Sequence, residues 1–116
     1  MNFRMDRING EMQKNISDII RNKIKDPRVA GKMISVLSVN CAKDLKTAKV
    51  YISVYGNKED AKKAFEGVCH CSGFIRKEMS MYFSDIRTIP QLSFFLDDSM
   101  EYSAKIDSIL EQIKNN

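Results

Sequence analysis

Residues 46–55, KTAKVYISVY, alternate cleanly between two kinds of side chain. One face of this segment carries the apolar residues Ala48, Val50, Ile52 and Val54. The other face carries Lys49, Tyr51, Ser53 and Tyr55. A repeat of two residues is the period of a half-buried β-strand, so the segment predicts a strand.

The segment before it predicts a partner strand. Residues 34–41 are rich in β-branched side chains, but their alternation changes phase between Val36 and Leu37, which indicates a bulge. The link 42–45 is short and polar, so the two strands should form an antiparallel hairpin. Gly56-Asn57 then ends the second strand with a turn.

Two helices are expected to follow the hairpin. Asn57 is a good N-cap and is followed by acidic residues and by apolar residues at helical spacing. The pattern weakens around Cys71-Ser72-Gly73 and resumes at Ile75, so the helices should meet at a kink of small residues. Ile89-Pro90 ends the second helix.

The two ends of the chain complete the fold. Apolar residues at intervals of three and four predict a long helix over residues 3–25, which Asp26-Pro27 ends. Residues 92–96 predict a short strand, and the pair Asp98 and Glu101 predicts the start of a terminal helix. The chain of 116 residues, 43% of them hydrophobic, is long enough for one core. We therefore predict a single α+β domain.

Composition excludes several classes of protein. No apolar run approaches a membrane span and the first ten residues do not resemble a signal peptide, so we expect a cytoplasmic protein without a membrane partner. Three cysteines do not form a disulfide framework, and one histidine gives little material for acid and base chemistry. Residues 1–96 carry 17 basic and 10 acidic side chains, whereas residues 97–116 carry two and five. The basic part is the expected face for a polyanion.

A charged stripe follows the polar side of the first predicted helix. It consists of Arg4, Arg7, Glu11, Lys14, Asp18, Arg21 and Lys25. At about 100° per residue these positions line up opposite the apolar stripe, with a net charge of +3. Two interpretations remain open: a solvated face held by pairs such as Glu11 with Lys14 and Asp18 with Arg21, or a surface that follows RNA phosphates.

Other candidate sites are weaker. Cys69-His70-Cys71 lacks a second ligand cluster, and in a helix the two cysteines would lie about 200° apart, so we predict no metal and no cofactor. Cys41 has no second histidine to activate it as a nucleophile, and the glycines are too scattered for a phosphate loop. The aromatic residues Tyr51, Tyr55, Phe94 and Phe95 could stack on bases, but packing in the core is the favoured interpretation.

Several segments, in their order and spacing, resemble the bacterial ribosome-binding factor A family. They are Asp26-Pro27-Arg28-Val29, residues 39–53, Gly73-Phe74-Ile75-Arg76, residues 87–94 and residues 97–99. The resemblance runs end to end and implies a KH-like (type II) RNA-binding domain over residues 1–98. Its order would be helix-strand-strand-helix-kink-helix-strand around a three-stranded mixed sheet, with an acidic helix over 99–116 packed on or flanking it.

The resemblance also implies where the chain differs from ordinary KH domains. Those domains clamp nucleic acid with a Gly-x-x-Gly loop, whereas this family has an Ala-x-Gly kink, to which Cys71, Ser72 and Gly73 correspond. Cysteine is only slightly larger than alanine, so the kink should survive. We expect Gly73 to lie at a close approach between helix and neighbour, so that valine there would lower stability.

The implied function is non-enzymatic. The family binds immature small (30S) ribosomal subunits and assists maturation of 16S rRNA, including its 5′ end, especially in the cold. We expect a monomer when free, whose basic residues contact rRNA phosphates. The candidates are Arg4, Arg7, Lys14, Arg21, Lys25, Arg28, Lys32, Arg76, Lys77 and Arg87. The alternative is a protein-interaction module that docks on ribosomal proteins or an assembly GTPase.

Overall fold

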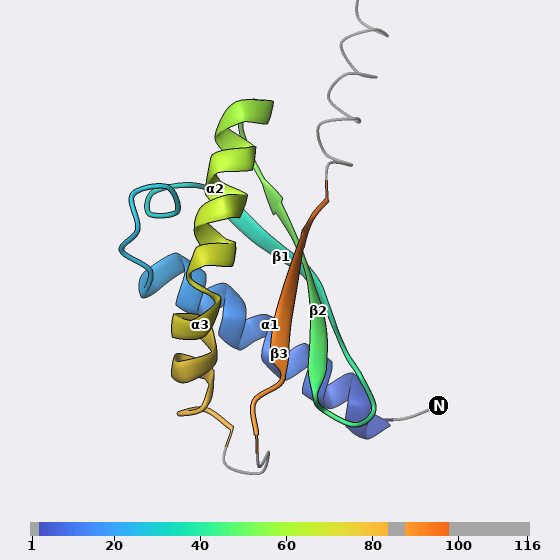
Figure 1. The fold of residues 1–116 in the computed structure, drawn as a ribbon. Coiled ribbons are helices and arrows are strands. Elements are labelled where there is room, and N and C mark those ends of the chain that lie inside the picture. Colours follow the sequence, from blue (N-terminus) through green and yellow to red (C-terminus); the bar gives the residue numbers. More distant parts are fainter. Residues whose placement is uncertain (1–2, 84–87, 98–116) are drawn as a thin grey trace, which may run out of the picture.

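A computed structural model describes residues 3–83 and 88–97 of the chain. The elements within these residues are α1 (Phe3–Asn22), β1 (Ile34–Cys41), β2 (Thr47–Val54), α2 (Lys58–His70), α3 (Ser72–Met79) and β3 (Gln91–Leu96). The sheet has the order β1-β2-β3, with β1 antiparallel and β3 parallel to β2 (Figure 1). The predicted α+β class, the element order and the three-stranded mixed sheet are confirmed. The predicted terminal helix, residues 99–116, lies outside the described residues.

The hairpin forms as its alternation predicts, including the bulge. The register between β1 and β2 shifts between Val36 and Ser38, which leaves Leu37 as the extra residue. In the link, the N–H of Ala42 donates to the carbonyl of Thr47, and Leu45 takes a left-handed φ of 60°. The phase change in the sequence is therefore a real β-bulge.

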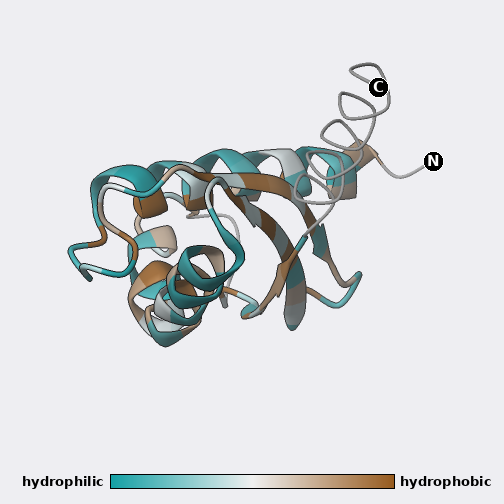
Figure 2. Ribbon diagram, turned by 90° about the horizontal axis from the view of Figure 1, so that it is seen from above, coloured by the Kyte–Doolittle hydropathy of each residue, from teal (hydrophilic) through white to brown (hydrophobic). Residues whose placement is uncertain are grey.

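One apolar core joins α1, the kinked helix pair and one face of the sheet. The residues that α1 buries, Ile8, Met12, Ile16, Ile19 and Ile20, recur every three or four positions. Alternate residues of the strands, such as Val50 and Phe94, complete the same core. Figure 2 shows the hydrophilic side of α1 turned away from the sheet. None of the helices within residues 3–83 and 88–97 is long and apolar enough to cross a membrane.

The first helix ends earlier than the period predicts. The N–H groups of Lys23 and Ile24 both donate to the carbonyl of Ile19, at 2.9 and 3.2 Å, and the helix stops at Asn22. Ile24 stays buried and continues the apolar period, because the connector between α1 and β1, residues 23–33, turns back onto the core. Lys25 therefore lies beyond the helix rather than on its stripe.

The kinked helix pair is confirmed, but its second helix ends at Met79 and does not continue to Ile89-Pro90 as predicted. The Asn57 side chain caps α2 by accepting a hydrogen bond from the N–H of Asp60, at 2.8 Å. Cys71, with φ −90° and ψ 9°, separates α2 from α3, which begins at Ser72. Among the described residues between β2 and β3, two helices take the place of one straight helix.

The prediction of a close approach at Gly73 is wrong. Gly73 is exposed, and a Cβ atom built there would meet nothing within 4 Å outside its own helix. The tight glycine is Gly67, where a Cβ would lie 2.7 Å from Cγ2 of Val29 and 3.0 Å from Cβ of Arg28. The small residue is required where the connector between α1 and β1 crosses α2, not at the kink itself.

Candidate RNA interface

The charged stripe of α1 is exposed over its whole length. Because Ile8, Met12, Ile16 and Ile19 fill the core, the residues on the opposite side of the helix must face solvent. Arg4, Arg7, Glu11, Lys14, Asp18 and Arg21 are all exposed, as is Lys25 beyond the helix end. The structure thus brings four predicted cations, Arg4, Arg7, Lys14 and Arg21, onto one helical face.

Neither of the two ion pairs expected within this stripe forms. Glu11 with Lys14 and Asp18 with Arg21, four residues that the structure describes, form no salt bridges. Asp18 instead accepts a hydrogen bond from the Asn22 amide, at 2.6 Å. Within the described part of the chain, Lys14 and Arg21 have no hydrogen-bond or ion-pair partner. Their charges remain available to a polyanion.

Two polar side chains of α1 cover the free edge of β1. The Gln13 amide donates to the carbonyls of Val36 and Leu37, at 3.0 and 3.2 Å, at the bulge. The Asn9 side chain accepts from the N–H of Cys41, at 2.9 Å. These bonds fix α1 along the edge strand and protect that edge from pairing with another chain. Sequence reasoning missed both residues, because polar positions on an amphipathic helix carry no signal of what they contact.

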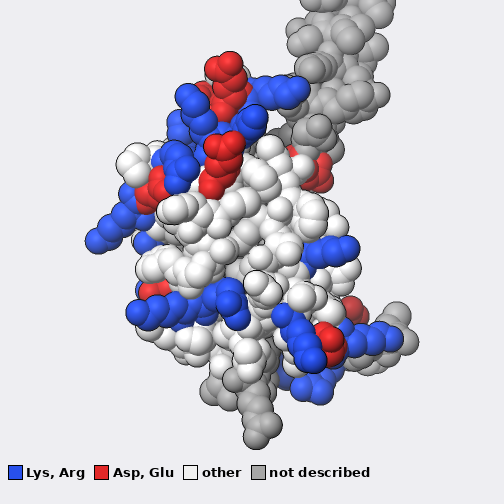
Figure 3. Space-filling view, viewed as in Figure 1, with Lys and Arg blue, Asp and Glu red and all other residues white. Residues whose placement is uncertain are grey.

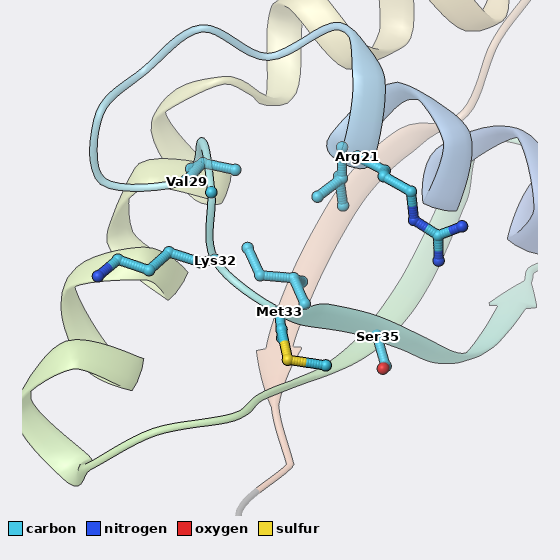
Figure 4. A pocket seen from close by; sticks show the side chains of 8 residues that line it. Arg21, Val29, Lys32, Met33 and Ser35 are labelled. Atoms are coloured by element: carbon cyan, nitrogen blue, oxygen red, sulfur yellow. The ribbon is translucent and has the colours of Figure 1, made fainter.

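Two clefts adjoin along this boundary and share Arg21. The first, of about 430 Å³, lies between α1 and β1 and is lined by residues that include Gln13, Lys14 and Val36. The second, of about 450 Å³, lies between the end of α1, the connector and the start of β1, and includes Lys32 and Met33. Figure 4 shows Arg21 on the α1 side of the second cleft and Lys32 on the other side, with the Lys32 side chain pointing away from Arg21. We call the two clefts together, with Lys14, Arg21 and Lys32, the basic groove.

The connector holds Arg28 in an ion pair rather than leaving it free. Its guanidinium donates to both carboxylate oxygens of Asp26, at 3.2 and 2.9 Å, and its backbone N–H donates to the same carboxylate at 2.9 Å. These hydrogen bonds lower the pKa of Asp26 to about 2 and raise the pKa of Arg28 above its ordinary value. Arg28 is exposed, so a phosphate could reach it only in competition with Asp26.

The low pKa of Asp26 predicts how stability varies with pH. Between about pH 2 and pH 4 the unfolded chain binds more protons at Asp26 than the folded chain, so this contribution to stability rises with pH and is lost as pH falls through 2. Carboxyl NMR titration should give Asp26 a midpoint near 2. Arg28→Gln should return that midpoint toward the ordinary value. Lys32→Gln removes an equal charge without touching Asp26, so a similar rise in that control would contradict the assignment.

Arg76 has a structural role. Its guanidinium donates to the carbonyls of Pro90 and Ile89, at 3.1 and 2.9 Å, and so ties α3 to the segment that leads into β3. Lys77 is exposed on α3. Lys23 pairs with Glu78 at 3.7 Å and joins the end of α1 to α3. Arg87 lies outside the described residues.

The kink residues offer no reactive group. Ser72 is half-buried and Gly73 exposed, while Cys71 is half-buried beside the connector. Burial raises the pKa of all three thiols, at Cys41, Cys69 and Cys71, above the ordinary value. A raised pKa keeps a thiol protonated at neutral pH, which argues against a thiol enzyme. No cluster of three metal-ligating side chains occurs among the residues that the structure describes.

Comparison with known proteins identifies the family of the chain. The profile of the family described as "Ribosome-binding factor A" matches residues 4–110, nearly the whole chain. The chain belongs to the ribosome-binding factor A family. A relative of that name from Clostridium botulinum (strain Eklund 17B / Type B) is 45% identical over 115 residues, which cover 98% of this chain and 97% of the relative. Another, from Caldanaerobacter subterraneus subsp. tengcongensis, is 41% identical over 113 residues, covering 97% and 91%.

Solved structures of ribosome-binding factor A share the fold. The crystal structure of the Thermus thermophilus protein superimposes with a TM-score of 0.68 at 17% identity, over 79% of this chain and 93% of that one. A Thermus thermophilus homology model, fitted into the cryo-EM map of a 30S complex with ribosome-binding factor A, has a TM-score of 0.61 at 18% identity, covering 78% and 91%. The KH-like architecture is therefore retained at low sequence identity.

Proposed function

We propose that this chain is a non-enzymatic assembly factor that binds immature small ribosomal subunits through their 16S rRNA. Through that binding it assists rRNA maturation, including processing of the 5′ end, above all at low temperature. The observation that carries the proposal is the basic groove, in which Lys14, Arg21 and Lys32 stand without ion-pair partners in the described structure. Membership of the ribosome-binding factor A family supports the ribosome as the source of the polyanion.

The contacts that the groove can make are those of backbone recognition. Exposed lysine and arginine side chains bind phosphate oxygens and position a protein on RNA without reading the base sequence. The related Thermus thermophilus protein, whose homology model was fitted into a 30S complex, supports the small subunit as the particle bound. Arg4 and Arg7 extend the same face along α1, and Lys25 is exposed in the segment that follows the helix.

Protein docking is the competing function. Phe74, Met81 and Tyr82, at and after α3, are 41%, 71% and 48% exposed, and they could anchor a ribosomal protein or an assembly GTPase. If the RNA contacts are as proposed, such protein contacts would add to them but would not replace them.

Sedimentation of cell extract tests the proposal. The chain should migrate with free small subunits, avoid translating ribosomes and leave the particles when their RNA is digested. Cells without the chain should accumulate unprocessed 16S rRNA, most visibly in the cold. Association that persisted on ribosomal proteins stripped of RNA would refute the RNA interface and favour protein docking.

A further inference from the structure

One face of the sheet carries none of α1, α2 and α3, the helices within residues 3–83 and 88–97. Alternate strand residues fill the core, so the residues between them point to the opposite side. There the rings of Tyr51 on β2 and Phe95 on β3 stack with centroids 5.3 Å apart and planes 24° from parallel. Tyr51 is half-buried and Phe95 is 41% exposed. We call this side the open face.

A third aromatic ring stands at the end of the open face. Tyr55 directly follows β2, is 73% exposed, and donates its backbone N–H to the carbonyl of Met33 at 3.0 Å. It lies four residues beyond Tyr51 on the same side of the chain, or about 13 Å along a strand. The small side chain of Ser53 between them is buried. The open face thus presents a stacked ring pair and a separate single ring.

The strands carry one charge, and it is positive. Within β1, β2 and β3 the only charged residue is Lys49, exposed on the open face beside Ser93 of β3, while Asp97 directly follows β3 and donates its N–H to the carbonyl of Ile52 at 2.7 Å. Figure 3 shows charged side chains gathered near α2 and near the N-terminal end of α1, with largely uncharged surface between them. Apart from the rings, most strand residues on the open face are small and polar, such as Ser35 and Ser93. The rings therefore stand without a surrounding apolar patch, whereas the core of a protein interface is largely apolar.

We propose that the open face is a stacking site for the bases of single-stranded RNA. Tyr51 with Phe95 forms one platform, Tyr55 forms another, and Lys49 contacts the adjoining phosphate. Sheet faces with exposed aromatic rings bind unpaired bases in this way, because every base offers a flat face to a ring. The inference rests on the proposed RNA-binding function and adds to it a substrate class: the basic groove follows phosphates, whereas the open face requires unpaired bases.

Binding of the full chain to a short oligouridylate, over a series of salt concentrations, tests the site. The double variant Tyr51→Leu/Phe95→Leu should bind about tenfold more weakly, because a stacked base contributes on the order of this factor or more. Its salt dependence should be unchanged, since no phosphate contact is lost. Lys49→Gln should instead reduce the salt slope by about 0.7, the value for one phosphate of a single strand. Oligouridylate should also quench tyrosine fluorescence in the parent chain and less in Tyr55→Leu.

Tyr82→Leu is the matched control, because Tyr82 is an exposed tyrosine that follows α3 and lies off the sheet. It should bind as the parent does. The single variant Tyr55→Leu keeps the test decisive if the double variant fails to fold, because that ring is mostly exposed and its loss should leave the fold intact.

Three outcomes would overturn the inference. The first is parental affinity in both Tyr51→Leu/Phe95→Leu and Tyr55→Leu. The second is an equal loss in Tyr82→Leu. The third is magnetisation transfer from the Tyr51 and Phe95 rings to the methyl groups of residues 98–116, which would show that the chain covers this face itself. If the parent binds small subunits in any of these cases, the proposed function stands and only the open face fails. If the parent binds neither small subunits nor oligouridylate, the proposed function fails as well.

Discussion

Replacing Lys14, Arg21 and Lys32 together by glutamine is expected to weaken binding to small ribosomal subunits by about two orders of magnitude at about 0.1 M salt. The three cations line the basic groove and have no partner in the described structure, so each can displace a counterion from a phosphate. Each lost phosphate contact lowers the salt slope by about 0.9 for a duplex, so the slope should fall by nearly three. The loss should be nearly the same for different RNA sequences.

The fold should survive these substitutions, because all three side chains are exposed and none belongs to the core. A control with the same change in charge is Lys43, Lys62 and Lys63 to glutamine, at exposed positions in the hairpin link and on α2. It should lose little affinity. Equal losses in the two triple variants would mean that binding follows net charge alone, and the groove would then have no special role.

The fold could be predicted from the sequence because its elements differ in period. A repeat of two in β2, a repeat of three and four in α1, and the change of phase at Val36 each report the local geometry directly. The end of α1 was misplaced because Ile24 is apolar and buried and so continues the helical period after the helix has ended. Burial alone therefore does not distinguish a last helical turn from a connector that folds onto the core.

The candidate site was predictable in part. Exposure of the α1 stripe follows from its position opposite the core, but the partner of each cation depends on residues distant in sequence. The sequence predicts phosphate contacts for Arg28 and Arg76 because both are basic, yet Arg28 pairs with Asp26 and Arg76 binds the carbonyls of Ile89 and Pro90. A period reports which side a residue faces, whereas the contacts of a long flexible side chain are set by the tertiary fold.

The two aromatic strand residues on the open face illustrate the same limit. Phe94 packs in the core as expected, whereas its neighbour Phe95 stacks on Tyr51 on the other side of the sheet. The sequence favours packing in the core for Phe94 and Phe95 alike, and also for the two strand tyrosines. Adjacent residues of a strand must point to opposite sides, so the pair Phe94-Phe95 could not both be in the core.

Gly67→Ala and Gly73→Ala are expected to change stability in opposite directions. Both glycines lie in helices with ordinary negative φ, so alanine should favour each helix by about 0.5 to 1 kcal/mol. At Gly73 the new methyl group would meet nothing within 4 Å outside its own helix, and the gain should appear in full. At Gly67 it would lie 2.7 Å from Cγ2 of Val29, which is itself 2% exposed, so that Val29 or the backbone must shift.

Overpacking of this kind costs about 1 to 3 kcal/mol, which exceeds the helical gain at Gly67. With 1 kcal/mol equivalent to about 4 to 8 °C in a domain of this size, the two variants should differ in Tm by roughly 10 °C. Because the same residue is introduced into a helix in both cases, the difference isolates the contact between α2 and the connector. Val29→Ala removes the clashing methyl group. In the Val29→Ala background, Gly67→Ala should therefore cost less stability than it costs in the parent chain. Equal melting temperatures for Gly67→Ala and Gly73→Ala would contradict this prediction and show that the connector can move away from α2. The packing that holds Arg28 and Asp26 beside the kink would then be loose.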